Sequence, residues 1–316
     1  KEQLVICLRW GHHDLVPHED FIGLYEIPNT EASTIFQALQ DVFLRFNLKI
    51  RKVCGQCYDM AASMAGVRNG VATKLKVIEP KAVYMHCYGH ALNLACSDAL
   101  QACPVMRDAL EYAREITKLI KDSPRRDAIF CKLKETISAP PTAGIRVLCP
   151  TRWTVRAEAL TSIAENYDVL CQVWEEALDY VKDTEMRCRI RGIASCMTTF
   201  KFFFGLLLAE MLLNHCDNLS KALQSKTKEL SASEGQYVAS LTVTTLELLR
   251  SEDSFQLFWE KVKLCAAKLT CVIGEPELPR RRRPPRWLDS GAAPFHHTSV
   301  NSYYKSLYFD GLDNII

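Results

Sequence analysis

Long apolar runs are missing from this sequence. The most lipid-like stretch, residues 200–213, is interrupted by Lys201 and Glu210 and falls short of the ~20 apolar residues that a membrane-spanning helix needs. We therefore predict a buried helix there and no membrane partner. The chain also opens without an initiator Met or a signal peptide, since Lys1 leads at once into a strand pattern, and we interpret it as a fragment.

An excess of one charge is missing as well. Lys and Arg total 39 and Asp and Glu total 37, and the resulting net charge of +2 is too small to indicate nucleic acid unless the cations cluster. The 14 cysteines lie scattered in apolar patterns rather than in a disulfide framework, which favours a reduced intracellular compartment. No glycine-rich phosphate loop and no strand–turn–helix elbow for a Ser or Cys nucleophile is present.

Residues 1–95 carry an α/β pattern. Apolar strands at 4–8 and 21–25 predict a hairpin with a buried first strand, and a helix follows from Thr30. One face of that helix is apolar at helical spacing and comprises Ile35, Phe36, Leu39, Val42, Phe43 and Phe46. A β-prone segment at 48–54, a helix at 70–78 and a strand at 82–85 complete the pattern, which implies parallel pairing of the last two strands.

Residues 96–275 lose the strand pattern and predict an all-helical block. The amphipathic runs are 104–121, 151–182, 185–224, 227–249 and 252–273. Residues 276–298 form a Pro/Arg-rich loop, and residues 299–316 return to an amphipathic helix that we expect to lead toward a C-terminal dimerisation region. The predicted fold class is therefore α/β plus all-α.

Residues with the chemistry of a site follow the two strands that are expected to be parallel. Asp59 ends the first, and His86, Cys87 and His90 follow the second. Open α/β sheets bind ligands at the carboxyl ends of their strands. A single aspartate cannot hold a catalytic metal pair, and the chain offers it no convincing partner acid. The alternative is that Asp59 caps the next helix.

The order of these motifs resembles the core of the hAT superfamily of DNA transposases. The motifs that carry the resemblance are residues 58–66, 86–94 and 151–153. Further segments resemble the vertebrate hAT-derived proteins named MYM-type zinc-finger proteins, or repressors of the inhibitor of the interferon-induced protein kinase, namely residues 1–10, 18–26 and 303–313. The resemblance covers nearly the whole chain.

The resemblance implies an RNase H-like fold that is interrupted by an all-helical insertion. It also implies three acids that bind Mg or Mn, of which Asp59 matches the second. The first would lie on a strand before Lys1 and the third, a Glu, beyond Ile316. We therefore expect a partial RNase H-like domain with its first strand missing, and a sheet that is split or re-paired.

Cys87 and His90 match the Cys-x-x-His motif that this superfamily carries beside its active site, close to the DNA. Together with Cys54 and Cys57 they also have the chemistry of zinc ligands, and His86 could replace His90. The pairs emerge from sheet strands rather than from a zinc knuckle. We therefore favour four partly buried residues that order a loop over a zinc site.

By the same resemblance, Trp153 matches an insertion-domain Trp that stacks near a flipped base, and Arg152 beside it would suit a phosphate contact. The alternative is a core Trp at a helix start with Thr151 as its N-cap.

A basic run lies in the Pro/Arg-rich loop. It could contact phosphate or act as a nuclear import signal, or it could be a solvated linker, and it comprises Arg280, Arg281, Arg282, Arg283 and Arg286. We expect a nuclear protein.

Three functions remain open. The favoured one is a domesticated, catalytically incomplete, transposase-derived protein that acts as a DNA- or protein-binding scaffold and self-associates through a region beyond Ile316. The second is the central part of an active transposase, which cleaves DNA and transfers strands with divalent metal. The third is a protein-interaction module without a nucleic-acid role.

Overall fold

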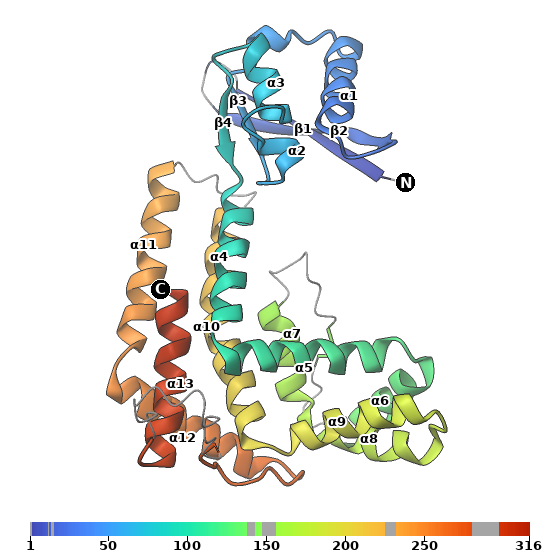
Figure 1. Cartoon of the computed structure of the whole chain (residues 1–316), viewed down its shortest axis with the longest axis vertical. Helices are drawn as coiled ribbons and strands as arrows, with labels where there is room; N and C mark the ends of the chain where they lie inside the picture. Colours follow the sequence, from blue (N-terminus) through green and yellow to red (C-terminus); the bar gives the residue numbers. More distant parts are fainter. Residues whose placement is uncertain are drawn as a thin grey trace, which may run out of the picture. The chain divides into compact units, whose positions relative to one another are not determined.

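The computed structural model describes residues 2–11, 13, 16–137, 143–146, 156–224, 232–279 and 297–316. The chain packs as two compact units, residues 1–92 and residues 93–316, each with its own core (Figure 1). Helix α4 (Tyr88–Ala102) contains the boundary between them.

The first unit combines short strands with short helices. Its elements in chain order are β1 (Glu2–Gly11), β2 (Pro17–Ile27), α1 (Ala32–Arg45), a 3-10 turn (Ile50–Lys52), β3 (Gly55–Tyr58), α2 (Ala62–Ala65), α3 (Val71–Ile78) and β4 (Val83–His86).

Strands β1 and β2 form the predicted antiparallel hairpin, with a register shift between Ile6 and Cys7. The prediction that the first strand is buried is wrong. Val5 is 56% exposed and Phe21 is 64% exposed, whereas Leu4 and Ile27 pack against the core of the unit. The hairpin therefore contributes to the core mainly through the end where β1 begins and β2 finishes.

Helix α1 confirms the prediction from its apolar spacing. Its buried face contains Ile35, Phe36, Val42 and Phe43. The helix ends where Asn47 adopts a left-handed conformation, with φ of 51°, and the Leu48 N–H donates to the Phe43 carbonyl at 2.8 Å. This is the pairing that satisfies the last carbonyls of a helix and turns the chain back toward the core.

The predicted strand at 48–54 is wrong, because residues Ile50–Lys52 form a 3-10 turn. Ile50 and Val53 both pack against the core. Their spacing of three residues places both on one side of such a turn, whereas a strand would separate them. The strand lies at β3, which pairs in parallel with β4, and the predicted strand and helix at 82–85 and 70–78 are confirmed. Strand pairing is split between two two-stranded sheets, as expected.

The second unit is helical. After α4 it comprises α5 (Pro104–Lys121), α6 (Pro124–Ile137), α7 (Arg156–Glu165), α8 (Tyr167–Tyr180), α9 (Thr184–Met197), α10 (Phe200–Leu223), α11 (Ala232–Leu249), α12 (Glu252–Lys268) and α13 (Val300–Ile315). Two predicted helical runs are each broken in two. The breaks fall at Asn166, whose amide donates to the Ser162 carbonyl at 2.7 Å, and at Thr199, whose hydroxyl caps the Phe202 N–H.

Helix α10 is the central element of the second unit and packs on α5 and α7. Most of its apolar side chains are buried, so the predicted buried helix is confirmed. Among the described residues no single helix is long and apolar enough to cross a membrane, although α9 and α10 together, bent by 78° at their break, meet that length and composition.

Aromatic side chains join α10 to the C-terminal helices. Tyr304 of α13 packs against Phe204 of α10 with ring centroids 4.9 Å apart and against Trp259 of α12 at 5.2 Å. The buried Tyr308 donates its hydroxyl hydrogen to the Leu249 carbonyl at 3.0 Å. The predicted C-terminal helix therefore closes the core of the unit.

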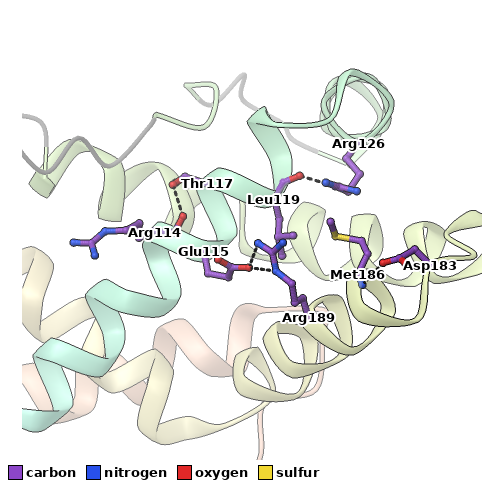
Figure 2. A network of polar contacts seen from close by, with 8 residues as sticks. All are labelled: Arg114, Glu115, Thr117, Leu119, Arg126, Asp183, Met186 and Arg189. Atoms are coloured by element: carbon purple, nitrogen blue, oxygen red, sulfur yellow. Dashed lines mark hydrogen bonds and ion pairs between the residues drawn. The ribbon is translucent and has the colours of Figure 1, made fainter.

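Polar contacts connect α5 to α9. Figure 2 shows the Arg189 guanidinium, which donates twice to one Glu115 oxygen, at 2.8 and 2.5 Å. The buried Arg126 donates to the Leu119 carbonyl at 2.5 Å and fixes the start of α6 against the end of α5. Helix α6 is not among the predicted runs, since its buried face contains only Arg126 and Phe130.

Candidate functional site at the ends of β3 and β4

The two parallel strands bring the predicted site residues to one edge. Tyr58 lies opposite His86, so Asp59 and Cys87 follow at the same end of the pair. The Cys87 N–H donates to the Tyr58 carbonyl at 3.0 Å and extends the pairing by one residue. The prediction that the two strands end side by side is confirmed.

Asp59 is exposed at this edge, and its carboxylate stabilises the turn that follows. Its Oδ1 accepts the Ala61 N–H at 3.1 Å. Helix α2 starts one residue later, with Ala61 at its N-cap position. The alternative of a helix-capping aspartate is therefore wrong, because Asp59 closes a turn before the helix. Its Oδ2 has no hydrogen bond or ion pair within the described part of the chain.

Tyr84 of β4 fixes the backbone of that turn. Its hydroxyl donates to the Asp59 carbonyl at 3.1 Å and lies 3.0 Å from His86 Nδ1. Both contacts are satisfied when His86 carries its proton on Nδ1 and donates it to the Tyr84 oxygen. Sequence reasoning missed Tyr84, although its position two residues before His86 on a strand places both on one face.

The cysteines of the edge meet as a pair. The Cys57 thiol is hydrogen-bonded to Cys87. Although the residue as a whole is exposed, partial desolvation of the thiol, followed by the neighbouring Cys87, raises the pKa of Cys57 above its usual value. Both are free thiols. Cys54 is exposed and His90 is half-buried. Across the described ranges, no three His, Cys, Asp or Glu side chains gather as ligands for one metal.

Gln56 fixes β3 to the elements packed against it. Sequence reasoning did not identify this role. Its side-chain amide is buried and donates to the Ala72 and Ala82 carbonyls, each at 3.1 Å. These bonds connect β3 to α3 and to the residue that precedes β4. Gln56 and Tyr58 alternate along β3 with the exposed Cys57, and burial raises the pKa of Tyr58 to about 12. The sequence signal that could have identified Gln56 and Tyr58 as inward-facing residues was the alternation of side chains along a strand, which has a period of two.

The remaining predicted site residues lie outside the described residues. They are Arg152 and Trp153 with the neighbouring Thr151, and the basic run of Arg280, Arg281, Arg282, Arg283 and Arg286.

The donors at this edge do not fit a two-metal phosphoryl-transfer centre. Such centres hold two ions about 4 Å apart between carboxylates. Among the described residues the edge supplies one carboxylate, Asp59, beside the hydroxyl of Tyr84, the imidazole of His86 and the two thiols of Cys57 and Cys87. This set can position a backbone or accept and donate hydrogen bonds at an exposed surface.

Two family models match the chain. Residues 1–70 match the ZMYM1/FAM200 RNase-like domain, and residues 85–189 match the ZBED1 RNase-like helical domain. The first match contains the hairpin, α1 and Asp59, and the second contains Cys87, His90 and the helices from α4 to α8. The RNase-like match precedes the helical match along the chain, which is the order of domains that the resemblance implied. Together the two matches indicate a hAT-transposase-derived protein of the ZBED/ZMYM-like group.

Proposed function

We propose that this protein is a domesticated transposase derivative that binds DNA as a scaffold and does not cleave it. The observation that carries the proposal is the environment of Asp59. Its carboxylate is the only one at the strand edge among the described residues, and one of its oxygens accepts the Ala61 N–H. If Asp59 serves to stabilise a turn rather than to bind metal, the protein keeps the fold and the surface of a transposase core without its cleavage chemistry.

The architecture supports binding by an intact scaffold. The helical unit has an extensive apolar core that runs from Leu100 to Leu312, and the Glu115–Arg189 pair fixes α5 and α9 to each other. A rigid helical unit can present the same charged surface repeatedly to a partner without chemistry at the strand edge. Residues 1–95 are, in this proposal, part of an RNase H-like core.

The test combines a binding assay and a cleavage assay on the full-length protein. Labelled double-stranded DNA is incubated with Mg²⁺ or Mn²⁺ and with wild type, Asp59→Asn or Asp98→Asn. We expect DNA binding that weakens steeply with salt, and no strand cleavage by any of the three. Asn keeps an oxygen for the Ala61 N–H, so Asp59→Asn should fold normally.

Asp98 is the matched control, since it is an exposed aspartate on α4. Metal-dependent nicking by wild type and Asp98→Asn that disappears in Asp59→Asn would establish an active transposase. Failure of the wild type to bind DNA at low salt would overturn the DNA scaffold and leave the protein-interaction module as the remaining proposal.

We further propose a nuclear location and self-association through a C-terminal region, as expected from the basic run and from the resemblance. Imaging of the tagged protein, with Arg281, Arg282 and Arg283 changed together to Gln, tests the first proposal.

A further inference from the structure

A small hollow in the helical unit gathers positive charge. It has a volume of about 70 Å³ and is formed by α4, α5 and the first residue of α7. The polar residues that line it are Ser97, Gln101, Arg107, Glu111, Arg114 and Arg156. Three guanidinium groups therefore share one hollow with a single carboxylate. The hollow lies within residues 85–189, which match the ZBED1 RNase-like helical domain, and it shares no residue with the strand-edge site.

The three arginines differ in what already holds them. Arg107 is paired with its neighbour Asp108 at 2.8 Å. Arg156 donates to the Ser97 hydroxyl at 3.2 Å. The Arg114 guanidinium makes no hydrogen bond or ion pair with the described residues, and Figure 2 shows it directed away from the Glu115–Arg189 pair. Arg114 is thus the cation that is available to a ligand.

The residues that line the hollow carry more positive than negative charge. They include the cations Arg107, Arg114 and Arg156 and one acid, Glu111, whereas Asp108 is paired with Arg107 outside the lining and the buried Asp217 lies near Arg156. Like charges in one concavity raise each other's free energy unless an anion enters between them. Guanidinium groups match the geometry of phosphate oxygens, and the Ser97 hydroxyl and Gln101 amide add neutral donors.

The cations continue along α5 beyond the hollow. Lys118 and Lys121 follow Arg114 after four and seven residues, which places all three on one helix face, and each is exposed. Lys121 is paired with Asp127 at 3.0 Å, and Lys118 has no ion pair among the described residues. At 1.5 Å per residue, Arg114 and Lys118 are about 6 Å apart along the axis. An extended row favours a polyanion over one free phosphate.

We propose that the hollow of α4, α5 and α7 holds one phosphate of a nucleic-acid backbone, with the exposed face of α5 along the strand. This inference rests on the proposed DNA-binding function and names the surface that would carry it. It uses no residue of the strand edge.

The test compares three variants of the full-length protein by fluorescence anisotropy on double-stranded DNA across a salt series. Arg114→Gln should weaken binding about five- to tenfold and lower the slope of log K against log salt by about 1. Glu111→Gln should tighten binding about twofold. Arg191→Gln removes the same charge from an exposed position on α9 and should leave the slope almost unchanged.

Equal losses in Arg114→Gln and Arg191→Gln would overturn the site, because total charge alone would then explain both. Wild-type binding with an Arg114→Gln slope equal to that of wild type would also overturn it and leave the proposed function standing. No binding by wild type would instead remove the proposed function. A titration with inorganic phosphate at constant ionic strength distinguishes a site for free phosphate from a site for the phosphate of a nucleic-acid backbone. Saturation by phosphate that depends on Arg114, without any effect of Arg114→Gln on DNA, would overturn the nucleic-acid assignment.

Discussion

Asp217 is a carboxylate that is buried in the core of the helical unit, where its charged form is poorly solvated. It lies on α10 with 2% of its surface exposed, and neither of its oxygens has a hydrogen-bond partner among the described residues. Burial raises its pKa to about 6, although the charge of Lys221 acts in the opposite direction. The folded protein therefore takes up a proton at Asp217 more readily than the unfolded chain does.

The change Asp217→Asn should stabilise the protein at neutral pH. The folded pKa lies above the ordinary value of 3.8, so the cost of the charge is absent at low pH, grows between about pH 4 and pH 6, and is complete above that. We expect a gain on the order of 2 kcal/mol at pH 8 and almost none at pH 4. Urea unfolding at both pH values measures it.

The control for this change is Asp179→Asn, an exposed aspartate on α8. It should alter stability by only a few tenths of a kcal/mol at either pH. A gain for Asp217→Asn that is the same at pH 4 and pH 8 would mean that the charge is not the cause.

The positions of Asp59 and Cys87 could be predicted because both follow strands in a β–helix–β order. Parallel pairing then brings their ends together whatever the rest of the fold does. The roles of Gln56 and Tyr84 could not be predicted, because their partners lie 16 to 26 residues away in sequence. Such bonds exist only once α3 and β4 are packed.

At the scale of elements, helix boundaries were harder to predict than helices. Apolar spacing continues through residues 185–224, yet Thr199 interrupts the run by capping α10. A threonine side chain can accept a backbone N–H locally, and the 78° bend between α9 and α10 then points each apolar face at the same core. Hydrophobic periodicity cannot reveal a bend of this kind, because it shows which residues of each helix are apolar but not the angle between two consecutive helices.

Gly205 marks the closest approach of α10 and α5. A Cβ at this position would lie 2.8 Å from the Val105 carbonyl oxygen and 3.0 Å from its Cγ2. Gly205→Ala should therefore destabilise the protein by about 2 kcal/mol through overpacking, despite the better helix propensity of alanine. Thermal and urea unfolding measure the change.

Gly192 on α9 provides the opposite case. A Cβ there meets nothing within 4 Å. Gly192→Ala should stabilise the protein by about 0.5–1 kcal/mol. If both glycine variants shifted stability in the same direction, the close contact of α5 and α10 would not determine the outcome.

At the scale of the whole molecule, the two units have separate cores. The first contains Leu75, 2% exposed, and the second contains Leu206, fully buried. Leu75→Ala should cost about 2–5 kcal/mol, and the resulting loss of amide protection should be confined to residues 1–92. Leu206→Ala should produce the converse pattern in residues 93–316.

Hydrogen exchange followed by mass spectrometry distinguishes these outcomes, since peptides report on each unit. Loss of protection over the whole chain from Leu75→Ala alone would show that the units unfold together. The sequence predicts an α/β part and a helical part, because strand patterns alternate with helical ones before residue 95 and only helical patterns follow it.

Helix α13 has a consequence for how the protein is made. Tyr304, Tyr308 and Leu312 complete a core whose first members stand near Leu100. A ribosome that adds about 5–20 residues per second needs roughly 10–40 seconds to travel between them. Once α10 and then α12 have been made, their aromatic faces lack their cover until Tyr304 and Tyr308 are added, so the core of the helical unit is completed only late in synthesis.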